Sequence, residues 1–352
     1  MKKHRITLFF FLVSFIVVTS LTMNLQLTKS LKESRQELTL KTRSAHQAGV
    51  NVVTTISIIA DWTQQVSGDL AEVTSIVTGL EDPHTYEPTT SEIQTVAGAD
   101  LFIRMGIPGL EPWAESTIDS TGLPESKILA LVNFTAQEYM EPDPILDNSK
   151  NPHVWMSPVN AKDMVTKIYN KLAEIDSAND ATYLQNANDY KTELDSLLGR
   201  INSAKSTLQG TKVVVHHPAF VYLFDLLGIE RLAAIEEHEG EEPSAEHIAE
   251  IIQLMKDENC QLLVNQPQLE EGKIIEIARE TGAKIADLTP LLGTLEFESG
   301  TESITTYIDM IDFNIDAIQN PHDPSSASAP GFTILAFLVV IPVLLYVHKK
   351  RK

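Results

Sequence analysis

Short apolar runs rich in β-branched residues alternate with amphipathic segments along most of the chain. In the first half the apolar runs cover 52–59, 73–78, 101–105 and 128–132, with helical patterns at 61–68, 90–97 and 111–119. In the second half they cover 212–215, 231–235, 262–265 and 284–288, with helical patterns at 219–227, 245–256, 270–281 and 301–318. Strands alternating with helices predict parallel sheets covered on both faces. We therefore predict an α/β fold with two (β/α)4 lobes, at 50–156 and 210–320.

A helical segment, 157–209, separates the two lobes. Ser157 and Pro158 predict the start of a helix that runs to about Ile175, because proline is favoured at the first helical position. A second helix is expected from about Asp180 to Leu208, where apolar residues recur at steps of four and three. Sustained heptads are also typical of a coiled-coil dimer, which is the alternative. At about 1.5 Å per residue this helix spans on the order of 40 Å, so we expect a rigid link between lobes in a monomer.

Both ends of the chain carry apolar segments that do not belong to the lobes. Residues 1–23 have a basic start and an apolar run without a clear cleavage site, which predicts a signal peptide or a signal anchor. Residues 24–49 are polar and predict a tether, and 321–331 predict a flexible spacer. Residues 332–352 combine an apolar run with a basic tail, which predicts a transmembrane segment with the lobes on the outer side of the membrane.

Charge and cysteine content narrow the choice of partners and of metal ligands. Leaving out the seven basic residues at the two ends lowers the net charge from −21 to −28, so nucleic acid is not an expected partner. The only cysteine is Cys260. A disulfide framework and a thiolate zinc site are therefore both excluded, and any metal must be bound by nitrogen and oxygen.

Histidines next to prolines recur at positions where the predicted strands end. His84 lies between Pro83 and Pro88, His153 follows Pro152, and His217 precedes Pro218. Ligands bind outside the carboxyl ends of strands in open parallel sheets, so these histidines are expected in the crevice between the lobes. Asp287, at the end of the last predicted strand, is the fourth candidate. Three imidazoles and one oxygen favour Zn²⁺, with Mn²⁺ as the alternative.

Other histidines compete with these candidates. His216 precedes His217 directly and is the rival ligand at that position. His238 and His247 lie in or just after an acidic run and are expected to be solvated. The sequence has no glycine-rich phosphate loop, no His-Glu-x-x-His pair and no Gly-x-Ser-x-Gly turn, so the common enzyme signatures are missing.

The ordered motifs resemble those of the zinc and manganese substrate-binding subunits of ABC importers. The resemblance covers roughly 51–318 and is carried by Asp82-Pro83-His84-Thr85-Tyr86-Glu87-Pro88-Thr89, Asn151-Pro152-His153-Val154-Trp155, His217-Pro218-Ala219-Phe220 and Glu242-Pro243-Ser244, with Tyr307 to Asn314 similar too. It implies two similar lobes joined by a long helix, an ABC permease with its ATPase as partner, and metal ligands at His84, His153 and His217. It also favours His217 over His216.

The sequence departs from this family pattern in two places. The family has an aspartate just before the Pro-Leu pair near the last strand, whereas here Thr289 precedes Pro290 and the nearest carboxylate is Asp287. The fourth ligand can therefore be Asp287, a glutamate or water. Residues 134–152 occupy the place of a histidine-rich loop in zinc members but contain no histidine.

The C-terminal segment has a resemblance of its own. Pro330-Gly331-Phe332, an apolar span and a basic tail are similar to an archaeal sorting signal that is replaced by a lipid anchor. We expect a protein tethered to the outer face of the cytoplasmic membrane that captures zinc, or manganese, for a permease, and not an enzyme. A zinc hydrolase with three histidines and a surface adhesin are the competing functions.

Overall fold

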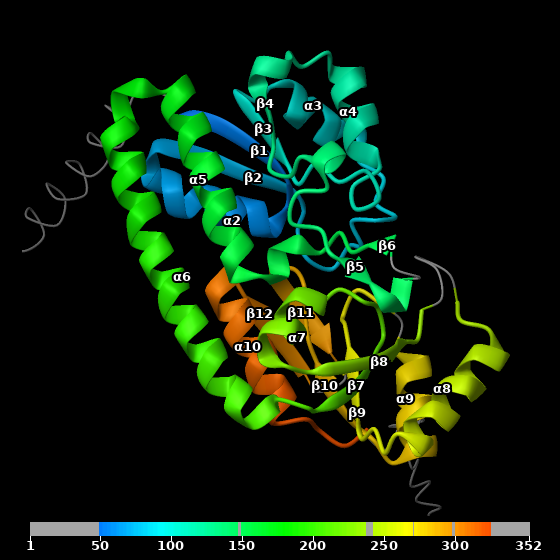
Figure 1. Ribbon diagram of the computed structural model, residues 1–352. Coiled ribbons are helices and arrows are strands. Elements are labelled where there is room, and N and C mark those ends of the chain that lie inside the picture. The colour runs from blue at the N-terminus through cyan, green and yellow to red at the C-terminus, as the bar shows by residue number, and fades with distance from the viewer. Residues whose placement is uncertain (1–48, 147–148, 237–241, 270, 298–299, 325–352) are drawn as a thin grey trace, which may run out of the picture.

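The computed structural model describes residues 49–146, 149–236, 242–269, 271–297 and 300–324. Four parallel strands form its first sheet, in the order β2-β1-β3-β4 (Figure 1). The strands are β1 (Val50–Ile56), β2 (Ala71–Val77), β3 (Leu101–Arg104) and β4 (Ile128–Ala130), and the helices between them are α2 (Ser57–Ser67), α3 (Thr90–Ala97) and α4 (Trp113–Thr121). The middle strands are buried on both faces because helices cover both sides of the sheet.

The second sheet repeats this design with the strand order β10-β9-β7-β8. The strands are β7 (Lys212–Val215), β8 (Glu230–Ala234), β9 (Leu262–Asn265) and β10 (Lys284–Asp287), and the helices are α7 (Val221–Leu227), α8 (Ala245–Asp257), α9 (Gly272–Thr281) and α10 (Tyr307–Gln319). The α/β class with two four-stranded parallel sheets is therefore confirmed.

Two element boundaries differ from the sequence prediction. The apolar run expected as a strand at 52–59 ends as a strand at Ile56, and α2 begins at Ser57 rather than near Asp61. A short apolar run does not distinguish a buried strand from a buried helix, and Ile58 and Ile59 are fully buried on α2. Asp61 accepts a hydrogen bond from the backbone N–H of Tyr307 at 2.9 Å instead of capping the helix.

The last helix is also shorter than predicted. Residues 301–304 lie in an antiparallel pair made of β11 (Gly293–Phe297) and β12 (Gly300–Ile304), and α10 begins only at Tyr307. The hydroxyl of Thr306 caps the helix by accepting a bond from the N–H of Asp309 at 3.1 Å. The sequence at 301–304 gave no sign of a strand, because Ile304 is the one apolar residue among these four and a single residue sets no period.

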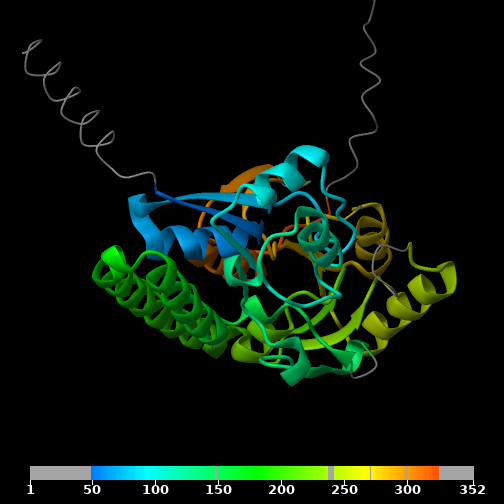
Figure 2. The same cartoon turned by 90° about the horizontal axis from the view of Figure 1, so that it is seen from above.

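Two long helices lie along one side of the molecule, as both views show (Figures 1 and 2). They are α5 (Pro158–Ile175) and α6 (Asp180–Leu208), the boundaries expected from the sequence. α6 contacts α2 and α5 at one end and α7 and α10 further along, so it passes both sheets. Its buried residues are Tyr183, Ala187, Tyr190, Leu194, Leu197, Ile201, Ala204 and Leu208. The stripe that suggested a coiled coil is therefore buried inside this chain.

Residues 134–152, which we call the connecting segment, lead from β4 towards α5. Within it β5 (Pro142–Asp143) pairs with β6 (Ser149–Lys150). After it comes one turn of 3₁₀ helix, Val154–Met156, whose three side chains are buried. Figure 1 shows β5 and β6 near β8, beside the second sheet.

Loops from the two halves meet at two glycines. Gly79, after β2, has a φ of 129°, and a Cβ there would lie 2.0 Å from the carbonyl oxygen of Leu292. Gly293 has a φ of 152°, and a Cβ there would lie 2.5 Å from the carbonyl oxygen of Thr78. Only glycine tolerates both the backbone conformation and the close approach. The loop that leads to His84 is thus held against the chain that follows Pro290.

Within the described part of the chain, no helix is long and apolar enough to span a bilayer. The expected signal segment, the tether apart from Gly49, most of the spacer and the C-terminal apolar segment lie outside the described residues.

Candidate metal centre

His84 lies on a loop between β2 and α3 that local hydrogen bonds hold in shape. The carboxylate of Asp82 accepts bonds from the N–H of His84 at 3.0 Å and from the hydroxyl of Thr85 at 3.1 Å. Trp113 donates from its indole nitrogen to the carbonyl of Pro83 at 3.1 Å. The imidazole Nδ1 of His84 lies 2.8 Å from the carbonyl oxygen of Gly109. Contacts to the loop backbone and a contact to the imidazole ring therefore both fix the orientation of this side chain.

His153 and His217 are nearly fully buried, with 3% and 6% of their surfaces exposed. Nδ1 of His153 lies 3.0 Å from the side-chain oxygen of Asn151, two residues earlier. Nδ1 of His217, just after β7, contacts the carboxylate of Glu236, which follows β8. Each of these acceptors fixes the orientation of its imidazole.

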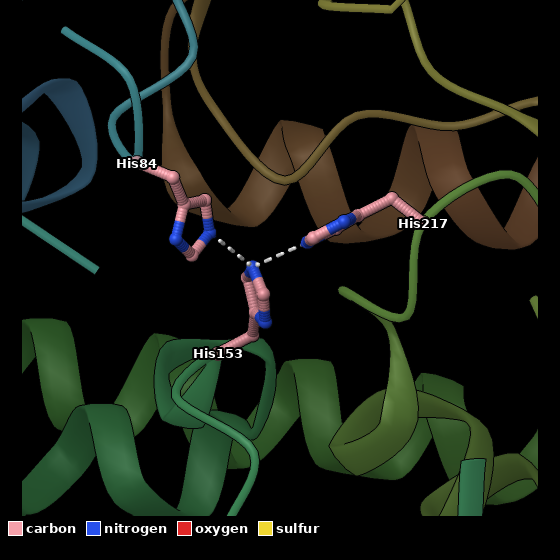
Figure 3. A group of neighbouring side chains, drawn as sticks. All are labelled: His84, His153 and His217. Atoms are coloured by element: carbon pink, nitrogen blue, oxygen red, sulfur yellow. Dashed lines mark hydrogen bonds between the residues drawn. The ribbon is translucent and has the colours of Figure 1, made fainter. Parts of the chain in front are cut away.

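The three histidines turn the same nitrogen towards one another (Figure 3). Nε2 of His153 lies 3.3 Å from Nε2 of His84 and 3.2 Å from Nε2 of His217, and the three ligand atoms all lie within 4.8 Å of one another. Ligands about 2.05 Å from a tetrahedral zinc ion are about 3.3 Å apart. Nε2 of His153 lies at about this distance from each of the other two nitrogens, as binding of one such ion requires.

Hydrogen bonding indicates the tautomer of each imidazole. A carbonyl, an amide oxygen and a carboxylate accept at the three Nδ1 atoms, so each neutral imidazole carries its proton on Nδ1 and a lone pair on Nε2. Burial, and then the neighbouring His217 and His84, hold the pKa of His153 well below 6.5. Three lone pairs that face one another in a buried place form an arrangement that a cation stabilises.

The space beside these nitrogens is small. A cavity of about 20 Å³ opens there, enough for a single ion or water. Leu110, Trp155 and Leu291 line its apolar part, while Gln266 and Gln268 add polar groups. The cavity gives no room for an organic substrate.

The structure places the other candidates outside this group. Asp287 is buried and accepts a bond from the amide of Asn265 at 3.0 Å, and its other oxygen lies 3.0 Å from Nε2 of His322. It is not among the residues whose ligand atoms converge. Burial lowers the pKa of His216 to about 4, and this side chain is not part of the group either.

Of the two histidines expected to be solvated, the structure describes His247 and does not describe His238. His247 is half-buried rather than fully solvated and donates from Nε2 to the carbonyl of Ala234 at 2.9 Å, and it does not belong to the group. His238 lies outside the described residues.

Sequence reasoning missed the residues that orient the imidazoles. Asn151 stands two positions before His153, a spacing typical of side-chain turns, so this partner was open to prediction. Gly109 and Glu236 are distant in sequence from the histidines they contact, and the sequence has no local signal that pairs them.

Comparison with known proteins places the chain in a family. A family model described as a periplasmic zinc-uptake complex component A, ZnuA, matches residues 52–320. The chain belongs to the ZnuA family. The expectation of a transport protein rather than an enzyme is thereby confirmed.

Relatives of this ZnuA family member carry different metals in their names. The manganese-binding lipoprotein MntA of Halalkalibacterium halodurans is 26% identical over 282 residues, which cover 76% of this chain and 87% of MntA. The high-affinity zinc uptake protein ZnuA of Bacillus subtilis is 28% identical over 283 residues, which cover 77% and 87%. A solved structure, the laminin-binding protein Lmb of Streptococcus agalactiae, is 27% identical with a TM-score of 0.63, and the match covers 77% of this chain and 98% of Lmb.

Proposed function

We propose that the protein captures a divalent transition metal outside the membrane and delivers it to an ABC permease with its ATPase. The observation that carries this proposal is the convergence of three Nε2 atoms whose Nδ1 protons are all engaged. His84, His153 and His217 are the proposed ligands. The names of the relatives, an uptake protein for zinc and a manganese-binding lipoprotein, support the same role.

Zinc is the proposed metal, with manganese as its rival. Neutral imidazoles make up the group, and zinc favours nitrogen ligands more strongly than manganese does. Metal analysis of protein purified without added metal, followed by titration with both ions, tests the choice. Manganese displacing zinc at equal concentration would contradict it.

For the fourth position we propose Asp287 or a water molecule. Asp287 would have to exchange its bonds with Asn265 and His322 for the metal, which requires the loop after β10 to move. Water needs no such movement. The variant Asp287→Asn separates the two, because zinc affinity falls only where the carboxylate binds the ion.

A hydrolase is the weaker proposal. It needs a general base beside the metal and space for a substrate. Two carboxylate residues line the cavity, which is small. Glu236 accepts the Nδ1 proton of His217, and Asp82 accepts bonds from the N–H of His84 and the hydroxyl of Thr85. Adhesion has separate support, because Lmb is described as a bifunctional protein with adhesin and metal-transporting activity. Binding of the purified protein to immobilised laminin tests it.

We also propose how the domains serve this function. Residues 50–156 and 210–320 form two lobes, and the helices of 157–209 link them, with α6 as a rigid element. Residues 1–23 and 24–49 hold the body near the membrane, while 321–331 are a spacer and 332–352 a second anchor or an archaeal sorting signal. Mass spectrometry of protein extracted from cells, which locates both mature ends, tests the anchoring.

A further inference from the structure

A buried ion pair connects the two halves of the molecule close to the histidines. Arg231 of β8 donates from Nη1 and Nη2 to the two carboxylate oxygens of Asp143 in β5, at 2.9 and 3.0 Å. Their side chains are 8% and 0% exposed. Asp143 belongs to the connecting segment and Arg231 to the second sheet, so the pair joins parts of the chain that are 88 residues apart.

The backbone around Arg231 is shaped for this contact. Val213 pairs with Arg231 and Val214 with Ala233, so Leu232 is an extra residue on β8. Such a bulge redirects the side chains beside it. A buried ion pair is often no more stabilising than apolar residues of the same size, because both charges lose their hydration. Fold stability therefore does not by itself account for this pair.

Asn151 links the ion pair to the metal ligands. Its amide nitrogen donates to Asp143 at 2.9 Å and to the carbonyl of Pro218, the residue after His217, at 2.8 Å. Its amide oxygen accepts from the backbone N–H and from Nδ1 of His153, both at 3.0 Å. The fully buried amide thus uses both donor hydrogens and both acceptor positions, which leaves it a single orientation.

We propose that Arg231 and Asp143 are positioning residues for the metal. They hold Asn151, and Asn151 holds His153 and the loop of His217 at the spacing that one ion requires. Zinc affinity therefore depends on an ion pair that touches none of the three histidines. This inference rests on the proposed function, because it assumes that the histidines bind the ion.

The test compares two double variants of the full-length protein in a zinc competition titration. Arg231→Met with Asp143→Leu removes both buried charges together, so neither is left unpaired. Loss of such outer partners of a metal site lowers affinity by about 10-fold to 100-fold, and we expect a loss in this range. Arg200→Met with Asp312→Leu is the matched control. It removes another bidentate arginine–aspartate pair, which joins α6 to α10 and is 46% and 40% exposed, and zinc affinity should not change.

The absorption spectrum of bound Co²⁺ gives a readout that a purely structural role would not move. We expect the ligand-field bands to shift in the first double variant and to match the wild type in the control. The single variant Arg231→Lys keeps the charge but loses the two-pronged contact, so a smaller loss, below about tenfold, is expected. If the double variant does not fold, this single variant decides the matter.

Two results would overturn the inference, and they are distinguishable. Wild-type zinc affinity and an unchanged Co²⁺ spectrum in the Arg231 variants would show that the ion pair does not position the site, and the proposed function would stand. Equal and weak zinc binding by the wild type and His153→Ala would remove the proposed function, and this inference with it.

Discussion

At the scale of single residues, the site depends on which imidazole nitrogen carries the proton. Three different acceptors, the carbonyl of Gly109, the amide of Asn151 and the carboxylate of Glu236, take the Nδ1 protons. The Nε2 lone pairs are left facing one another. In the proposed site, the preference for a cation would thus come from the partners of the histidines as much as from the histidines themselves.

The adjacent pair His216 and His217 allows a direct test of register. We expect His217→Ala to abolish tight zinc binding and His216→Ala to leave it largely intact, because neighbouring residues leaving a strand point in opposite directions. Zinc competition against a coloured chelator measures both. The reverse outcome would mean that the ligand assignment in the second half is wrong by one residue.

Glu111 gives the fold a pH dependence of its own. Burial raises its pKa from 4.5 to about 7, so the folded state holds this proton more tightly than the unfolded chain does. Its contribution to the free energy of unfolding is fully present below about pH 4.5 and is lost as the pH rises to about 7. Between pH 5 and pH 8 we expect the free energy of unfolding of the wild type to fall by roughly 1–3 kcal/mol more than that of Glu111→Gln. Urea unfolding at both pH values measures this difference. An equal change in the free energy of unfolding for the wild type and Glu111→Gln would contradict this assignment.

At the scale of elements, the repeated strand and helix pattern was enough to predict both parallel sheets and the two long helices. The start of α5 was predictable because a proline occupies its first position. The extent of α6 was predictable because apolar residues recur at helical spacing along its whole length. The β11–β12 pair was not, since its pairing depends on contacts between residues rather than on an apolar period. The sequence predicted that the histidines lie near one another only because the carboxyl ends of parallel strands lie along the same edge of a sheet.

The stripe on α6 predicts unequal costs for two leucines on one helix. Leu194 is fully buried and Leu184 is 42% exposed. We expect Leu194→Ala to lower the free energy of unfolding by about 2–5 kcal/mol, because it leaves a cavity, and Leu184→Ala to lower it by less than about 1 kcal/mol. Urea unfolding measures both. Similar small costs for the two would mean that the stripe is not packed within the chain.

At the scale of the whole molecule, one helix runs past both sheets, and a single apolar core includes residues of both halves. We expect such a helix to resist hinge bending, so that closure on the metal is a small tilt. We expect the radius of gyration from X-ray scattering to be nearly the same for the metal-free and zinc-loaded protein. A large compaction on zinc binding would contradict the rigid role of α6.

The central claim is that three histidines bind one metal ion, and calorimetric titration tests it most directly. We predict that the wild-type protein takes up one zinc ion per chain with high affinity, and that His153→Ala, which removes the nitrogen closest to both others, loses this uptake. Equal zinc uptake by His153→Ala and the wild type would contradict the account.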